Sequence, residues 1–345
     1  MRIVVRLVAF AFMLMPPIGA SAENLQAALR ATAGEYVAKI AAIAPVAGRD
    51  TTYDYYERLV DDAAAIDETG VPAGYTAVAW SQTLTATAQL DLTLARQLLD
   101  RSFRPMATIR GLGESLIRSS SDGTMQPVAV YVPKSYASGH PAPLVVMLHG
   151  RPQSETQLLA PPYIASLAEE TGAIVVAPWG RGYYNFRGSA ADVYDALQAA
   201  TESFAIDPRR RFLAGYSMGG FSVFEVAPLH ANDWSAVMCI AGGLLGSNAQ
   251  RVVASMPRMP FYVLTGTADE SIPTQYPTVT AAFLQASGIE VSFYSQPGGE
   301  HRLVTLLPIL TRAWGDMLHG VVRAPPLQFG GLMLPSSIPA MATRP

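Results

Sequence analysis

The stretch Gly215-Tyr216-Ser217-Met218-Gly219, followed by Gly220, decides how this chain is interpreted. It fits the pattern G-x-S-x-G, in which a serine stands on a tight turn between a strand and a helix, with its hydroxyl exposed at the carboxyl end of the sheet. The flanking residues agree, because the strand-like run 211–214 precedes the motif and a helix-compatible run, 221–226, follows it. Ordinary strand-to-helix turns also show this short pattern, so its meaning depends on the rest of the chain.

Short apolar runs alternate with helix-like segments on both sides of this motif. Continuous apolar runs are typical of parallel strands buried on both faces, and their alternation with helices predicts βαβ units. The predicted strands are Ser115–Arg118, Val128–Val132, Leu144–Leu148, Ile174–Ala177, Phe212–Ala214, Ala236–Ile240, Phe261–Thr265 and Val291–Ser295. The predicted helices are Ser154–Thr171, Ala190–Phe204, Gly219–Ala227, Gln275–Ser287 and Arg302–His319. This pattern predicts an α/β fold with a mostly parallel eight-stranded sheet flanked by helices.

Two histidines come late enough in the chain to serve as a catalytic base. A base in this architecture follows the last strand, and of the five histidines only His301 and His319 do so. His301 lies in a glycine-rich turn directly after the predicted strand 291–295. His319 falls near the end of the last predicted helix, where a cation commonly interacts with the helix dipole. We therefore predict His301 as the base, with His319 as the alternative.

An acidic side chain is needed to orient this base. A buried apolar run ends in Gly266-Thr267-Ala268-Asp269-Glu270, which places Asp269 at the carboxyl end of a strand. Glu270 is the neighbouring alternative, and a structural role for Asp269 would be to cap the next helix. The chain order Ser217, Asp269, His301 is the order expected of this architecture, so the three residues together are predicted as the catalytic group.

The loop His149-Gly150-Arg151-Pro152 follows the predicted strand 144–148. Backbone N–H groups at such a junction stabilise the negative charge that develops on a carbonyl oxygen during acyl transfer. Since Pro152 has no N–H, we predict the amide of Arg151 as one donor and the amide of Met218 as the second. His149 is predicted to hold the shape of the loop.

Composition and the N-terminus limit the compartment and the partners. Half of the residues are hydrophobic, 15% are charged and the net charge is −3, which argues against disorder and against nucleic acid as a partner.

Arg2 and Arg6 precede an apolar stretch that is too short to span a bilayer, and Ala20-Ser21-Ala22 supplies small residues for cleavage. Residues 1–22 are therefore predicted as a signal peptide, cleaved after Ala22, of a secreted or periplasmic protein without a stable membrane anchor. The alternative is an uncleaved anchor.

The remaining chain divides into three predicted parts. Residues 23–110 form a helical extension with helices at Asn24–Ala44, Thr52–Asp67 and Ala77–Asp100, which either packs structurally or overhangs the site as a lid. Residues 111–320 form the α/β domain, and 321–345 a proline-rich, loosely packed tail.

The single cysteine, Cys239, is interpreted as core filling. No His, Cys and carboxylate cluster has metal-ligand spacing, so no metal or organic cofactor is predicted.

Four of these motifs together resemble the α/β-hydrolase superfamily of serine hydrolases: His149-Gly150, Gly215–Gly220, Gly266–Asp269 and Gly298–His301. Within that superfamily they look most like secreted esterases of the feruloyl-esterase and polyhydroxybutyrate-depolymerase type, and like the catalytic domains of prolyl oligopeptidases. The resemblance covers about residues 112–320 and implies the α/β-hydrolase fold.

The resemblance implies hydrolysis of carboxylic esters through an acyl-enzyme on Ser217, with a small-molecule or polymeric ester as substrate. The alternatives are a prolyl-oligopeptidase-like serine peptidase acting on short peptides, and a non-catalytic binding protein on the same scaffold. The loop 178–187 follows a predicted strand on the catalytic side and carries Trp179, Tyr183 and Tyr184. We expect it either to bind an aromatic or acidic acyl group or to pack on its own aromatic residues.

Overall fold

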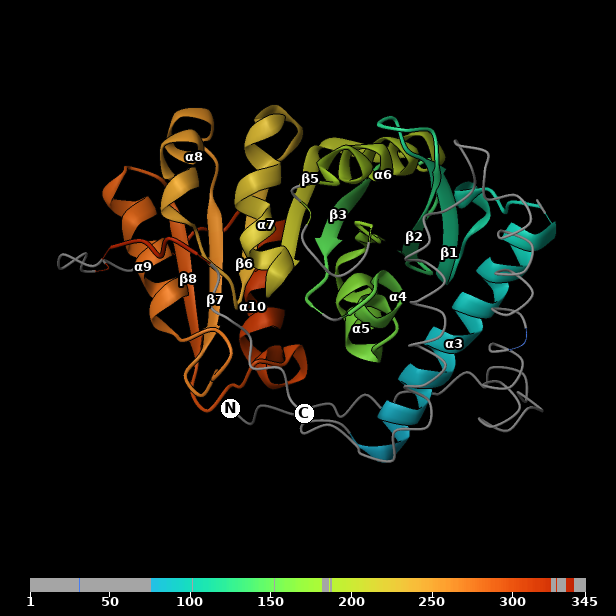
Figure 1. Ribbon diagram of the computed structural model, residues 1–345, viewed down its shortest axis with the longest axis horizontal. Helices are drawn as coiled ribbons and strands as arrows, with labels where there is room; N and C mark the ends of the chain where they lie inside the picture. The colour runs from blue at the N-terminus through green and yellow to red at the C-terminus, as the bar shows by residue number, and fades with distance from the viewer. Residues whose placement is uncertain are drawn as a thin grey trace, which may run out of the picture.

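An eight-stranded sheet runs through the middle of the molecule in the order β1-β2-β4-β3-β5-β6-β7-β8 (Figure 1). The computed structural model describes residues 31, 76–100, 102–151, 153–181, 186, 188–323, 327 and 333–337. β2 is antiparallel to both of its neighbours, and all later pairs are parallel, so the predicted mostly parallel sheet is confirmed. The strands are β1 Gly111–Arg118, β2 Met125–Val132, β3 Ala142–Leu148, β4 Ile174–Pro178, β5 Ile206–Tyr216, β6 Ala236–Ile240, β7 Phe261–Gly266 and β8 Val291–Gln296.

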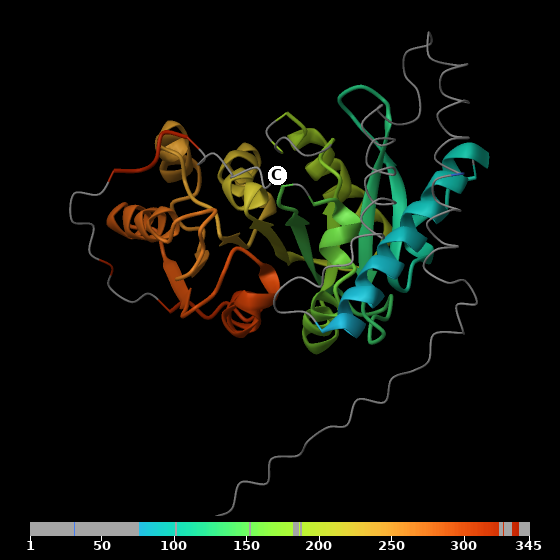
Figure 2. The same cartoon turned by 60° about the horizontal axis from the view of Figure 1, so that its bottom comes forward.

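Helices cover both faces of this sheet, as the turned view in Figure 2 shows. One face carries α6 (Ala190–Ser203), α7 (Met218–Val226), α8 (Ala249–Ser255) and α9 (Gln275–Ala286). The other face carries α4 (Glu155–Leu159), α5 (Pro162–Thr171) and α10 (Leu307–Leu318). Short 3-10 turns lie between the longer elements: η1 Met106–Thr108, η2 Ala227–Leu229, η3 Ala231–Asp233, η4 Gly246–Asn248 and η5 Leu303–Leu306.

The two covered faces explain why the strands are continuous apolar runs. In β3, Leu144, Val146 and Leu148 pack in one core cluster, whereas Val145 and Met147 pack in the cluster on the opposite face. Successive strand residues point to opposite faces, so a sheet covered on both sides needs an apolar residue at every position.

Cys239 follows the same rule in β6. Its side chain is fully buried in the core, as predicted, and this burial raises the pKa of its thiol well above the ordinary value. A thiol that stays protonated is a poor nucleophile, so Cys239 fills space rather than reacting.

The predicted helix Ser154–Thr171 is in fact two helices. Pro161 and Pro162 stand at the junction between α4 and α5. A proline lacks the N–H for a helical hydrogen bond and disfavours the helical conformation of the residue before it, so the first helix ends here and the second begins with Pro162. The structure also contains α8, which the sequence analysis did not predict.

The longest described element of the N-terminal extension is the helix α3 (Ala77–Asp100), over the predicted range. It lies beside α4 and β1 at one end of the sheet, with Leu92 and Leu94 buried. The buried Asp91 accepts a hydrogen bond of 3.3 Å from the hydroxyl of Thr156 in α4. This helix therefore packs against the α/β domain. The predicted signal peptide and the predicted helix 52–67 lie outside the described residues, as does the predicted helix 24–44 apart from residue 31.

The described residues of the proline-rich tail are more closely packed than the sequence suggested. Leu327 and Leu334 pack against the core, and the N–H of Leu327 donates to Gln285 of α9. The carbonyl of Pro335 accepts a hydrogen bond of 3.0 Å from the N–H of Gly246. Proline lacks only its own donor, so its carbonyl can still bind a neighbouring loop.

None of the described helices has both the length and the apolarity that a membrane span requires.

Replacing Leu94 tests the docking of α3. Leu94→Ala removes a fully buried side chain and should lower the free energy of unfolding by roughly 2–5 kcal/mol, measured by urea unfolding. Val78→Ala, in the same helix but 67% exposed, should change it by less than about 0.5 kcal/mol. Equal effects of the two substitutions would contradict the docking.

Candidate active site

The strand order brings two functional loops together at one edge of the sheet. After β3 the chain passes to β4 on one side and then returns to place β5 on the other side of β3. β3 and β5 are parallel neighbours, with Leu148 in register with Gly215, so both strands end at the same edge. In α/β sheets, ligands bind at such a switch point, outside the carboxyl ends of the strands.

Ser217 occupies the sharp turn between β5 and α7. Its backbone has φ 54° and ψ −116°, a strained conformation for a residue with a side chain, and its N–H donates to the carbonyl of Ile240 at 2.8 Å. A Cβ on Gly215 would overlap the backbone of Gly219, and one on Gly219 would overlap the carbonyl of Leu148. The two glycines are required because strand, helix and neighbouring loop approach closely around the serine.

His301 and Asp269 meet Ser217 at this turn. His301 Nε2 lies 2.8 Å from Ser217 Oγ, and His301 Nδ1 lies 2.7 Å from Asp269 Oδ2. The other oxygen of Asp269 accepts hydrogen bonds from the N–H groups of Ser271 and Ile272, at 2.9 and 2.7 Å. These two hydrogen bonds fix the orientation of the carboxylate. The Asp269 carboxylate can therefore favour the His301 tautomer with its proton on Nδ1, which leaves Nε2 as the acceptor facing the serine hydroxyl.

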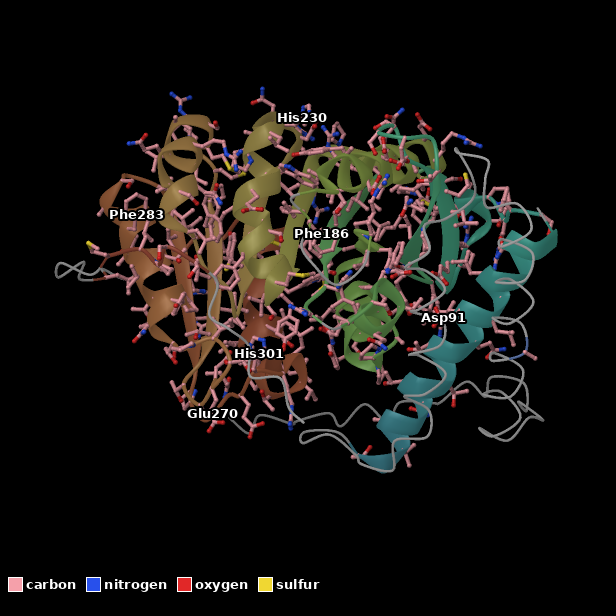
Figure 3. The ribbon with its side chains drawn as sticks, viewed as in Figure 1. Asp91, Phe186, His230, Glu270, Phe283 and His301 are labelled. Atoms are coloured by element: carbon pink, nitrogen blue, oxygen red, sulfur yellow. The ribbon has the colours of Figure 1, made fainter. Side chains whose placement is uncertain are left out.

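The structure separates the two alternative residues from this group. Glu270 is exposed, and Figure 3 shows it at the outer rim of the molecule, beyond His301. His319 is also exposed, at the end of α10, with its Nδ1 2.7 Å from the carbonyl of Gly315. Of the acids and histidines considered from the sequence, Asp269 and His301 are the ones that the structure brings to Ser217.

Tyr216 contacts the histidine twice, which the sequence analysis missed. Its ring stacks on the His301 imidazole with centroids 5.2 Å apart, and its hydroxyl donates to the carbonyl of His301 at 2.8 Å. Tyr216 precedes Ser217 at the end of β5 and is buried. No sequence signal marks this contact, because it joins residues 85 positions apart.

The two predicted oxyanion donors, Arg151 and Met218, belong to segments that lie next to Ser217. Met218 is the first residue of α7, directly after the serine. Arg151 follows Gly150, where a Cβ would come within 3.0 Å of Ser217 Cβ. The carbonyl of His149 also accepts a hydrogen bond of 3.1 Å from the N–H of Gly219, so the loop after β3 is attached to the start of α7.

The aromatic loop after β4 is only partly described. Trp179 is 1% exposed and Phe186 is fully buried, so these two side chains support the loop instead of offering an open surface to a substrate. Tyr183 and Tyr184 lie outside the described residues. Of the two expectations for this loop, the buried Trp179 and Phe186 side chains agree with internal packing and not with an open binding surface.

Neither a metal cluster nor a hollow between β1 and α6 marks this site. Among the described residues no three His, Cys, Asp or Glu side chains are placed to hold a metal ion. A hollow of about 490 Å³ lies between β1 and α6, lined by residues such as Arg104, Ser115 and Glu202, and includes none of the three reactive side chains. The site is identified by its geometry, and not by the size of a cavity.

The fold is the α/β-hydrolase fold, and the site has the geometry of a Ser–His–Asp triad. No family model matches the chain. It is 26% identical over 183 residues to a probable feruloyl esterase C of Aspergillus oryzae, across 50% of this chain and 66% of that protein. It is 28% identical over 160 residues to a bifunctional acetylxylan esterase/xylanase of Neocallimastix patriciarum, across 44% of this chain and 23% of that protein.

A solved structure of a ferulic acid esterase shares the fold with a TM-score of 0.50 at 14% identity, covering 60% of this chain and 97% of that one. The predicted resemblance to feruloyl esterases is thus confirmed. The chain nevertheless spans slightly less than two thirds of the length of the first curated relatives it matches.

The two adjacent acids provide a test of the geometry. Asp269→Asn keeps the shape of the side chain but destabilises the required histidine tautomer, so the turnover number for an activated ester should fall about 10,000-fold. Glu270→Gln, at the exposed neighbouring position, should leave it nearly unchanged. A larger loss with Glu270→Gln would overturn the assignment of the acid.

Proposed function

We propose that this chain is a serine hydrolase that cleaves carboxylic esters through an acyl-enzyme on Ser217. The observation that carries the proposal is the continuous contact from Asp269 through His301 to Ser217, with 2.7 and 2.8 Å between the bonded atoms. The strained backbone of Ser217 supports it, since such strain is characteristic of nucleophiles at a strand-to-helix turn.

In the first half of the reaction, Ser217 Oγ attacks the carbonyl carbon of the ester while His301 Nε2 accepts the hydroxyl proton. The electron pair of the C=O bond moves to oxygen, and the amides of Arg151 and Met218 stabilise the resulting anion. Asp269 stabilises the imidazolium. The tetrahedral intermediate then collapses, the alcohol leaves with the proton from His301, and the acyl group remains on Ser217.

Water completes the cycle by the same steps. The water oxygen attacks the acyl carbon while His301 Nε2 takes a proton from the water, and a second oxyanion forms at the same amides. Collapse breaks the bond to Ser217 Oγ, which regains its proton from His301. The reactants are the ester and water, and the products are a carboxylic acid and an alcohol. The side chains and amides of the chain itself carry out every step.

We propose an ester with an aromatic acyl group, of the feruloyl type, as the preferred substrate class. The similarity to proteins named feruloyl esterase supports this choice. The loop between β4 and α6 supports it independently, because Tyr183 and Tyr184 belong to a segment that begins directly after Trp179 at the catalytic edge. Short peptides and non-catalytic binding are the competing outcomes of the assays below.

We further propose that the protein is exported. The basic residues Arg2 and Arg6, the short apolar stretch after them and the Ala20-Ser21-Ala22 segment support this proposal. A secreted or periplasmic location would give the enzyme access to polymeric esters.

A substrate panel tests the proposed reaction. The purified protein should hydrolyse p-nitrophenyl acetate and butyrate, and should prefer methyl ferulate to a peptide p-nitroanilide in kcat/KM. Ser217→Ala should lower each rate by several orders of magnitude, because the triad acts as one unit. Preference for the anilide would indicate a peptidase, and equal rates for Ser217→Ala and the unaltered protein would indicate a non-catalytic scaffold.

Export has its own test. N-terminal sequencing of material recovered outside the cytoplasm should give a protein that begins at or near Glu23. Recovery of chains that retain Met1 would overturn the cleavage prediction.

A further inference from the structure

Three non-glycine residues have a positive φ among those described: Arg181 at 59°, Ser217 at 54° and Ala241 at 47°. Each lies within three residues of the carboxyl end of a strand, after β4, β5 and β6 respectively, so all three stand at the catalytic edge of the sheet. Such backbone strain costs roughly 1–3 kcal/mol and persists only where the surroundings impose it. The triad explains Ser217, but it gives Arg181 no role.

The Arg181 guanidinium binds oxygens from two other segments. Its Nε and Nη2 donate to the two carboxylate oxygens of Asp192, at 2.6 and 3.1 Å. Nη1 donates to Asp122, and Nη2 donates to the hydroxyls of Ser119 and Ser121 at 2.6 and 2.9 Å. Arg181 therefore fastens the β4–α6 loop to the turn between β1 and β2 and to the first turn of α6.

These contacts are stronger than those of an ordinary surface ion pair. The Asp192 side chain is 1% exposed and lies in the first turn of α6, where the helix dipole also favours a negative charge. The guanidinium holds the pKa of the Asp122 carboxyl well below its usual range, and the bonds to Asp192 and Asp122 raise the pKa of Arg181. A planar fork held by two carboxylates fixes orientation as well as distance.

The segment just before Arg181 contacts the loop that carries a predicted oxyanion donor. The carbonyl of Trp179 lies 2.9 Å from His149 Nε2, within hydrogen-bond distance. Ser189 donates to the carbonyl of Gly180 at 3.0 Å. The ring of Phe186, labelled in Figure 3, packs edge-on against His149 with centroids 5.0 Å apart. Trp179 and Phe186 of the β4–α6 loop thus both contact the fully buried His149 side chain.

His149 in turn fixes the backbone conformation of the loop after β3, which lies beside Ser217. Its carbonyl accepts from the N–H of Gly219, and its Nδ1 lies 2.9 Å from the carbonyl of Gly150. The next amide belongs to Arg151, the predicted donor. A displacement of Trp179 would therefore pass through the imidazole to the backbone that carries this amide.

We propose that Arg181 is a positioning residue for the oxyanion hole. By fixing residues 179–181 it holds the Trp179 carbonyl against His149, and thereby keeps the amide of Arg151 directed at the reacting oxygen. The inference rests on the proposed function, because the amide acts as a donor only when Ser217 reacts with a carbonyl group.

The test compares two identical substitutions in two similar ion pairs. Arg181→Lys keeps the charge but removes the fork. Arg323→Lys makes the same change in a fork bound to Asp316, at 2.6 and 3.0 Å, in the segment after α10 and outside the contacts around Ser217. Arg181→Lys should lower kcat for p-nitrophenyl acetate roughly 10- to 100-fold with little change in KM, since a shift of about 1 Å at a catalytic group costs on the order of 100-fold. Arg323→Lys should leave kcat unchanged.

A double-mutant cycle with His149→Ala identifies the route. If Arg181 acts through His149, the double variant should be no slower than His149→Ala alone. Losses that multiply would overturn the proposed route. If Arg181→Lys left kcat unchanged and lowered thermal stability as much as Arg323→Lys does, the contacts of Arg181 would have a purely structural role. That result would overturn the inference.

Hydrogen exchange gives a readout that does not need turnover. Amide exchange in a peptide covering 149–153 should be faster in Arg181→Lys than in the unaltered protein, and unchanged in Arg323→Lys. Unchanged exchange in both would overturn the inference. Faster exchange without any hydrolase activity in the unaltered protein would refute the proposed function, and the positioning role with it, and would leave only a structural link from Arg181 to residues 149–153. If Arg181→Lys fails to fold, Asp122→Asn, on a side chain 40% exposed, should show smaller changes of the same kind.

Discussion

The strained backbone of Ser217 is the constraint on which the rest of the site depends. With φ 54° and ψ −116°, the chain turns from β5 into α7 within one residue, and it can do so only because Gly215 and Gly219 leave room for the carbonyl of Leu148 and for each other. The conformation is unfavourable in isolation, so it must be imposed by hydrogen bonds and packing on both sides. The N–H of Ser217 bound to Ile240 supplies one such bond from the next strand. The nucleophile is therefore held by the sheet, not by its own loop.

The sheet topology delivers the other groups to this point. Parallel strands end at a common edge, and the reversal of strand order around β3 brings the loop at His149 beside Ser217 while the loops after β7 and β8 supply Asp269 and His301. Each side chain is fixed by a second contact: Asp269 by two backbone N–H groups, and His301 by the ring and hydroxyl of Tyr216. Preorganisation of this kind lets the charges of the reaction develop without rearrangement of the protein.

The loop between β4 and α6 connects the sheet to the surroundings of the candidate site. Its two ends are anchored, by the Arg181 ion pairs on one side and by the buried Phe186 on the other. In a shared fold, function differs between proteins chiefly through loops that a rigid scaffold positions.

The sequence by itself determined the class of fold and which three side chains form the candidate site. Apolar runs predicted β6 with the limits it has in the structure and located each of the other strands, because burial on both faces leaves a direct mark on composition. The error was largest in β5, which begins at Ile206 instead of the predicted Phe212, because its first residues are mostly polar and partly exposed. The spacing of Ser217, Asp269 and His301 after successive strands predicted three side chains that the structure brings together. Tertiary structure decided what local pattern cannot carry: the contact of Leu327 with α9, the stacking of Tyr216 on His301, and the pairing of Arg181 with Asp122 and Asp192. The physical reason is that strand burial and turn chemistry act between neighbours in the chain, whereas these contacts join segments whose proximity exists only after the sheet has formed.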